Sequence, residues 1–228
     1  MNLNSKILDN KNRGKNNIKI VLNMIVKNES KIIIRLLESV YEFIDSYCIC
    51  DTGSTDNTIE LINNFFDDKK IEGYVMKHQF KNFGYNRNWS LNKCKLLFND
   101  FDFILLLDAD MVVKYSKEFI ADKNNLTKYD YYCILQGNNA FKYKNIRLIK
   151  ISNSINYVGA THEYLNIPPH FKSKTFDENE IFIEDIGDGS NKGNKYERDI
   201  EILEYNIVEE PDNVRSYFYL ANSYFDIG

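Results

Sequence analysis

Two carboxylates that follow the most apolar stretch of the sequence are the first candidates for chemistry. Asp108 and Asp110 come directly after residues 101–107, so a strand would deliver them to a place with little water. Unpaired anions are costly there, and a divalent cation is their natural partner. The same carboxylates could instead cap the next segment or pair with an arginine. The pattern therefore indicates either a metal site or a structural ion pair.

Two further polar clusters follow apolar runs in the same way. Lys27-Asn28-Glu29 comes after residues 18–26, and Asp51-Thr52-Gly53 comes after residues 46–50. In an open parallel sheet, ligands bind in the crevice beyond the carboxyl ends of the strands. Three acidic strand ends on one edge are hard to explain by stability alone, so we expect a binding site there.

Arg87 is a candidate anion-binding residue. We expect it to open a helix about twenty residues before the acidic pair, where its guanidinium fork and the helix N-terminus would both suit a phosphate. The alternative is a surface arginine that pairs with the acidic edge.

The elements that must position these residues alternate regularly in the first half of the chain. Amphipathic helices are expected after the N-cap Ser30, after Asp56 and after Arg87, the last with Trp89, Leu96 and Leu97 facing inward. This alternation predicts a parallel, doubly wound α/β layer, and strands without long helices between them predict a mixed sheet in the second half. The expected strands are 18–26, 46–50, 73–80, 101–107, 131–135, 145–151 and 181–184.

The C-terminal part predicts a helical hairpin. Residues 187–193 are expected to form a flexible loop, and helices are expected at 196–208 and 214–225 around the turn at Pro211-Asp212. The pair resembles one tetratricopeptide unit, which cannot bury both of its faces alone. We therefore expect it to pack on the α/β body or on another copy of the chain, which would make a homo-oligomer.

Composition narrows the class of protein. The chain has 228 residues with 43% hydrophobic residues and a formal net charge of -4, as expected for a globular, enzyme-sized protein without a broad basic face for nucleic acid. No apolar stretch approaches the roughly 18 residues of a membrane span. Residues 1–17 are polar and are expected to be a flexible arm rather than a secretory signal. Four cysteines without CxxC or Cys/His clustering favour an intracellular, cytoplasmic protein with reduced thiols.

Five short motifs follow one another along the chain: Met24-Ile-Val-Lys-Asn-Glu29, Asp51-Thr-Gly-Ser-Thr-Asp-Asn-Thr58, Arg87-Asn88, Leu107-Asp-Ala-Asp110 and Gly159-Ala-Thr-His-Glu163. In this order they resemble the motifs of family 2 glycosyltransferases, especially the branch that carries tetratricopeptide helices after the catalytic domain. The resemblance implies a Rossmann-like GT-A nucleotide-diphospho-sugar transferase fold with a mixed central sheet over residues 18–193, followed by a helical hairpin over 194–228.

The resemblance also implies roles in binding a nucleotide sugar. Ile25, Val26, Lys27 and Glu29 would cradle the base and ribose, and Asp51 would accept a hydrogen bond from a uracil ring, which favours a UDP-sugar. Asp108 would approach the ribose and also the metal. Asp110 would bind the metal, Mn²⁺ or Mg²⁺, and this cation would stabilise the leaving nucleoside diphosphate. The residues implied near the donor sugar or its diphosphate are Arg87, Asn88, Gln136 and His162.

Glu163 is the candidate general base. An inverting transfer needs a base that deprotonates the acceptor hydroxyl as it attacks the anomeric carbon. His162 could orient Glu163 or bind phosphate, and the pair could also have only a packing role. Asp130 and Asp177 are alternative bases.

One departure from the family pattern concerns the metal. Where relatives commonly carry a histidine before a Gly-Tyr pair, this chain reads Glu184-Asp185-Ile186-Gly187. Asp185 could replace that histidine as an oxygen ligand suited to Mg²⁺ or Mn²⁺. Otherwise metal affinity would be weaker or the enzyme impaired.

The leading hypothesis is a metal-dependent, inverting transferase that moves a hexose from a UDP-sugar to a hydroxyl of a glycan, lipid or protein. The alternatives are nucleotidyl transfer or nucleotide-sugar hydrolysis on the same fold, and a noncatalytic nucleotide-sugar-binding module whose helical tail recruits partners. The basic, glycine-rich first loop of nucleotidyltransferases is absent from Val26-Lys27-Asn28-Glu29, and all three rim carboxylates needed for catalysis are present.

Overall fold

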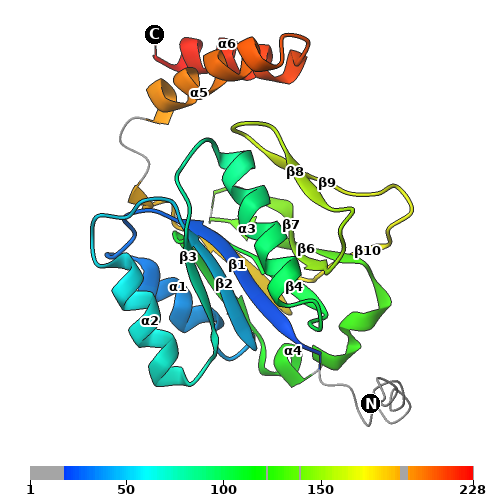
Figure 1. The fold of residues 1–228 in the computed structure, drawn as a ribbon. Helices are drawn as coiled ribbons and strands as arrows, with labels where there is room; N and C mark the ends of the chain where they lie inside the picture. The colour runs from blue at the N-terminus through cyan, green and yellow to red at the C-terminus, as the bar shows by residue number, and fades with distance from the viewer. Residues whose placement is uncertain (1–17, 122, 139, 191–194, 228) are drawn as a thin grey trace, which may run out of the picture.

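The computed structural model describes residues 18–121, 123–138, 140–190 and 195–227, which form an α/β domain and a helical hairpin (Figure 1). A nine-stranded mixed sheet runs through the domain in the order β3-β2-β1-β4-β7-β6-β11-β5, with β10 paired to β6, and β8 and β9 form a separate ribbon. The strands are β1 Ile20–Val26, β2 Ser46–Asp51, β3 Gly73–Lys77, β4 Phe103–Leu106, β5 Met111–Tyr115, β6 Tyr131–Gly137, β7 Lys142–Lys150, β8 Asn156–Val158, β9 Tyr164–Asn166, β10 Ser173–Thr175 and β11 Ile181–Asp185.

The first half is the parallel, doubly wound layer that the sequence predicts. β1 pairs in parallel with β2 and β4, and β2 pairs in parallel with β3. Alternate side chains of β1 enter two separate cores: Leu22 packs with α1 (Ile33–Val40) and α2 (Thr58–Lys69), whereas Val21 packs with α3 (Phe83–Leu97). Helices on both faces leave the carboxyl ends of β1, β2 and β4 at one edge.

The second half completes the mixed sheet. β7 runs antiparallel to β4 and β6, and β11 is parallel to β6 but antiparallel to β5. The strands predicted at 131–135, 145–151 and 181–184 are confirmed as β6, β7 and β11, whereas β5, β8, β9 and β10 were not predicted. The short helices α4 (Lys117–Ala121) and η1 (Lys123–Lys128) lie between β5 and β6.

Two helix starts differ from the prediction. α1 begins at Ile33 without a side-chain cap, so Ser30 is not its N-cap. α3 begins at Phe83, where the side chain of Asn82 accepts a hydrogen bond from the Tyr85 N–H at 2.8 Å, so Arg87 lies in the second turn and does not open the helix.

The inward face of α3 also differs from the prediction. It carries Ser90, Leu91 and Cys94, whereas Leu96 and Leu97 are 68% and 41% exposed. The buried stripe repeats at helical spacing, and the last two leucines of the helix lie off it.

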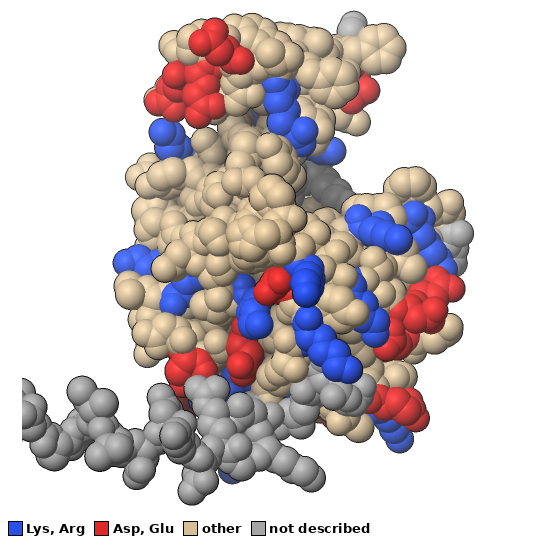
Figure 2. Space-filling view, turned by 90° about the vertical axis from the view of Figure 1, so that its right-hand side faces the viewer, with Lys and Arg blue, Asp and Glu red and all other residues tan. Residues whose placement is uncertain are grey.

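The predicted helical hairpin is confirmed as α5 (Lys195–Glu209) and α6 (Val214–Ile227). Figure 2 shows it as a lobe resting on the α/β domain, viewed from the side of β8 and β9. A buried bond between Asn206 Nδ2 and Ser216 Oγ at 3.0 Å joins the two helices. The arm expected at 1–17 and residues 191–193 of the expected loop lie outside the described residues.

The described ranges contain no helix that is both long and apolar enough to cross a membrane. The four cysteines are free thiols, and three of them are buried: Cys48, Cys50 and Cys94.

Candidate active site

A cavity of about 750 Å³ opens at the sheet edge where the predicted residues converge. One wall comes from the ends of β1, β2 and β4, and the other comes from residues 80–83 and α5. This is the place where open α/β sheets bind ligands, and the volume lies in the range of small-molecule sites.

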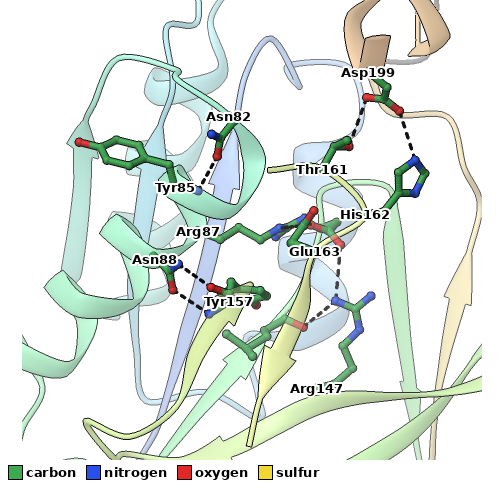
Figure 3. Close-up of polar contacts among 12 residues, drawn as sticks. Asn82, Tyr85, Arg87, Asn88, Arg147, Tyr157, Thr161, His162, Glu163 and Asp199 are labelled. Atoms are coloured by element: carbon green, nitrogen blue, oxygen red, sulfur yellow. Dashed lines mark hydrogen bonds and ion pairs between the residues drawn. The ribbon is translucent and has the colours of Figure 1, made fainter. Parts of the chain in front are cut away.

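Arg87 lines the cavity and is the centre of a polar network (Figure 3). Glu163 and Arg147 belong to this network but do not line the cavity. From α3, its Nε donates to Glu163 Oε1 at 2.5 Å and its Nη2 donates to Asp108 Oδ1 at 2.6 Å. Arg147 on β7 approaches the other oxygen of Asp108 through Nη1 at 3.4 Å. Arg87 therefore pairs with a carboxylate at the acidic sheet edge, which was the alternative interpretation of the sequence. It does so within the cavity wall and not on the outer surface.

The network sets the ionisation of its members. Burial alone would raise the pKa of Asp108, but the guanidinium groups of Arg87 and Arg147 outweigh it and hold that pKa below its usual range. Burial would lower the pKa of Arg87, yet the carboxylates of Asp108 and Glu163 raise it well above its usual value. Burial also raises the pKa of the neighbouring Tyr157 to about 12. At neutral pH the site therefore holds a fixed arrangement of alternating charges.

A tight turn delivers Glu163 to Arg87. Gly159 and His162 have φ values of 101° and 50°, so the chain reverses sharply between β8 and β9. A Cβ on Gly84 would lie 1.9 Å from the Gly159 carbonyl oxygen, so only glycine lets the start of α3 approach the turn this closely. The Phe83 N–H also donates to the Ala160 carbonyl at 3.0 Å. The need for Gly84 was not foreseen from the sequence.

Gln136 and Asn88 lie behind the cavity wall and do not line it. Gln136 is buried, accepts from Arg147 Nε at 2.7 Å and donates to the Tyr143 hydroxyl. Asn88 exchanges hydrogen bonds with the backbone of Tyr157 at 2.7 and 2.8 Å. Both position parts of the network, and their contact with a donor sugar stays a prediction.

His162 points toward the helical hairpin. Its ring stacks on Tyr219 of α6 with centroids 4.2 Å apart. Its Nε2 lies 3.7 Å from Asp199 Oδ2 of α5 (Figure 3). Burial lowers the pKa of His162, and the Asp199 carboxylate opposes this shift. His162 is not part of the cavity lining, so its predicted contact with the donor also stays a prediction.

The end of β1 lines the cavity at the positions that the sequence indicates: Ile25, Val26, Lys27 and Glu29. Glu29 is bound by Ser190, whose N–H and hydroxyl donate to its two carboxylate oxygens at 3.2 and 3.1 Å. Burial raises the pKa of Glu29, and these two hydrogen bonds oppose the shift.

Asp51 ends β2 at the same sheet edge but is buried behind the wall. Its carboxylate accepts from the Gly53 and Ser54 N–H groups at 3.0 Å, which fixes the turn after the strand. The next residue, Thr52, lines the cavity. Contact between Asp51 and a base therefore stays a prediction.

Replacing Glu29 by glutamine is expected to raise Tm at pH 8, with the gain shrinking toward pH 4. A carboxyl whose pKa is raised in the folded state stabilises fully only below its unfolded pKa, and this contribution is lost as the pH rises through the folded pKa. A neutral amide has no such cost. Thermal unfolding against pH measures the effect, with Glu178→Gln at an exposed ion pair as the matched control. A Tm at pH 8 below that of the wild type would mean that the Ser190 bonds outweigh burial.

The metal candidates are only partly gathered. Asp108 and Asp110 both line the cavity, and the two carboxylate oxygens of Asp108 face Arg87 and Arg147. Asp185 of β11 lies opposite Met111 of β5, and the N–H of the following residue, Ile186, donates to the Asp110 carbonyl at 3.2 Å. Asp185 is therefore near Asp110 in the sheet, but it does not line the cavity. Among the described residues no group of three or more His, Cys, Asp or Glu side chains could hold a metal. Mg²⁺ is often bound by one or two carboxylates plus substrate phosphates, and Asp110 fits that smaller donor set.

Several residues of the site were not foreseen from the sequence. Arg147 interrupts the apolar run Ile146-Arg147-Leu148-Ile149, and a charge inside such a run could have indicated a buried partner. Ser190 and Asp199 carried no comparable local signal.

Residues 22–120 match the family model described as Glycosyl transferase family 2. With the sheet order and the cavity above, this match identifies that part of the chain as a family 2 glycosyltransferase domain with a GT-A-type fold. No curated protein sequence matches the chain.

Solved structures with a similar fold include S. aureus TarS 1-349, with a TM-score of 0.54 and 15% identity over 92% of this chain and 72% of that chain. Its complex with UDP has a TM-score of 0.55 and 16% identity over 90% and 70%, respectively. Its complex with UDP-GlcNAc has a TM-score of 0.54 and 15% identity over 90% and 71%. At these identities the likeness is one of fold.

Proposed function

We propose that this protein is a metal-dependent, inverting glycosyltransferase that moves a hexose from a UDP-sugar to a hydroxyl acceptor. The observation that carries the proposal is one cavity, at the carboxyl edge of the sheet, walled by Glu29, Arg87, Asp108 and Asp110. The family 2 match of residues 22–120 supports glycosyl transfer, and the UDP and UDP-GlcNAc complexes of TarS support a uridine nucleotide donor.

The nucleotide would bind along the end of β1. Glu29 now accepts hydrogen bonds from the Ser190 hydroxyl and N–H. Ribose hydroxyls are donors of the same kind and would replace the Ser190 bonds when the donor binds. Asp51 would act from behind the wall by fixing the turn that presents Thr52.

Asp110 would hold Mn²⁺ or Mg²⁺ together with the donor phosphates, with Asp185 as a second candidate from the paired strand. When bound, the cation supplies Lewis-acid stabilisation of the leaving nucleoside diphosphate. Asp108, held by two arginines, would keep Arg87 turned toward the same space.

Glu163 would serve as the general base once the donor is present. Its carboxylate is now committed to Arg87. A donor diphosphate is a stronger partner for a guanidinium than a single carboxylate, so its arrival would loosen this pair. Glu163 could then accept the acceptor proton, which couples base activity to donor binding.

Titration calorimetry is expected to show UDP binding that strengthens with Mn²⁺, and Asp110→Ala should remove the strengthening because the cation loses its protein ligand. Asp185→Ala tests the second candidate ligand in the same assay. Asp212→Ala, in the exposed turn between α5 and α6, is the control and should leave the metal effect unchanged. UDP binding by the wild type that does not change with Mn²⁺ would refute the metal assignment.

A thermal-shift screen of nucleotide sugars with Mn²⁺ would identify the donor sugar, because binding raises the apparent stability of the protein.

A further inference from the structure

One face of α5 forms the cavity wall opposite the sheet edge. Lys195, Arg198, Glu201, Ile202 and Tyr205 line the cavity, and their spacing of three or four residues places them on one side of the helix. The opposite side is buried and carries Asp199, Leu203 and Asn206. The hairpin is therefore part of the cavity and not a separate appendage.

Buried polar contacts fix this wall to the α/β domain. The Asp199 side chain is buried and accepts from Thr161 Oγ1 at 3.3 Å and from Arg198 Nη2 at 3.0 Å. Arg215 of α6 donates to the His162 carbonyl at 2.8 Å. The Asp199 carboxylate is buried and has partners in both the α/β domain and α5, so it holds α5 at a defined distance from the turn that carries Glu163.

The wall alternates aromatic rings with charged groups. The Arg198 guanidinium lies 4.7 Å from the centroid of the Phe83 ring, and the Phe83 and Phe80 rings meet edge to face at 5.2 Å. Tyr205 is 56% exposed, and Lys81 Nζ lies 5.8 Å from its ring centroid. In contrast, the facing wall carries the carboxylates and the end of β1 that the proposed function gives to the nucleotide.

We propose that this α5 wall is the acceptor site and that its ligand is a carbohydrate. A pyranose ring has an apolar face that packs on an aromatic ring and a rim of hydroxyls that needs donors and acceptors close by. Tyr205 and Phe80 supply rings, and Glu201 with Lys81 supplies hydrogen-bonding groups of both kinds. An acyl chain would instead cover the Glu201 and Lys81 side chains without offering either of them a hydrogen-bonding group, which is unfavourable. The proposal rests on the proposed function, since it takes the facing wall as the donor site.

The test is saturation-transfer NMR on the full chain with UDP and diamagnetic Mg²⁺, using a panel of methyl pyranosides and short oligosaccharides as probes. We expect saccharide signals that Tyr205→Ala weakens by roughly tenfold in affinity, with UDP affinity unchanged. Tyr205→Phe keeps the ring and should restore binding. Tyr217→Ala removes a tyrosine of similar exposure on α6 outside the cavity and is the matched control. Thermal unfolding of each variant checks that it is folded.

Three results would overturn the proposal. The first is UDP binding with no saccharide binding. The second is equal weakening by Tyr205→Ala and Tyr217→Ala. The third is a lysophospholipid below its micelle concentration that binds in place of saccharides and loses affinity in Tyr205→Ala, which would make the acceptor a lipid. Failure of UDP to bind at all would refute the proposed donor site instead, and saccharide binding would still be measured without UDP.

Discussion

Glu163→Gln is expected to slow glycosyl transfer by roughly 100-fold or more while leaving UDP binding intact. Glutamine keeps the shape of the side chain and an oxygen that accepts from Arg87 Nε, so the network should keep its geometry. It cannot take a proton from the acceptor hydroxyl. Single-turnover transfer with the donor found by the thermal-shift screen, together with UDP calorimetry, separates the two effects.

Three other substitutions give this prediction its controls. Glu178→Gln makes the same chemical change at an exposed ion pair with Lys142 and should leave transfer unchanged. Asp130→Asn and Asp177→Asn test the alternative bases, whose carboxylates accept backbone N–H groups of Lys172 and Asn179. Wild-type turnover in Glu163→Gln, or a large loss in one of these two variants, would assign the base elsewhere.

The strand ends of the site could be predicted because they are local events in the sequence. β1, β2 and β4 each change abruptly from apolar to polar residues, and parallel pairing then brings the three ends to one edge. The same local signal could not show which side chains reach the cavity. Asp51 turns back onto its own backbone, and the adjacent Thr52 faces the cavity instead.

The partners within the site could not be predicted because they are distant in sequence. Arg87 meets residues 21 and 76 positions away, and no periodic pattern marks such pairs. Asp199 is a charged residue in an amphipathic helix, which alone predicts exposure. Its burial is explained by contacts with Thr161, His162 and Arg198. The sequence pattern around Pro211-Asp212 predicted two helices, but it gave no sign that one of them lines the cavity.

Arg87→Met is expected to lower the free energy of unfolding by about 3–5 kcal/mol, equivalent to roughly 10 °C in Tm, and to abolish most transfer. Arg87, Asp108 and Glu163 have side chains only 17%, 27% and 14% exposed, so the variant leaves two poorly hydrated carboxylates without their shared cation. In the variant, Arg147 would still pair with one carboxylate oxygen of Asp108. Glu163 would lose the hydrogen bond that it accepts from Arg87 Nε.

The pH dependence distinguishes this cause from a simple packing defect. The lowered pKa of Asp108 stabilises the wild type above its unfolded pKa, and this contribution is lost as the pH falls through the folded value. The difference in unfolding free energy between the wild type and Arg87→Met should therefore become smaller on acidification. If the variant only lost packing, this difference would not depend on pH.

Arg35→Met removes a more exposed bidentate pair with Asp188 and should lower the free energy of unfolding by no more than about 1 kcal/mol. Arg87→Lys retains the positive charge but loses the guanidinium fork that bridges two carboxylates. Its free energy of unfolding, measured with urea, should therefore lie between those of the wild type and Arg87→Met. A value equal to that of the wild type would show that the charge alone maintains the site.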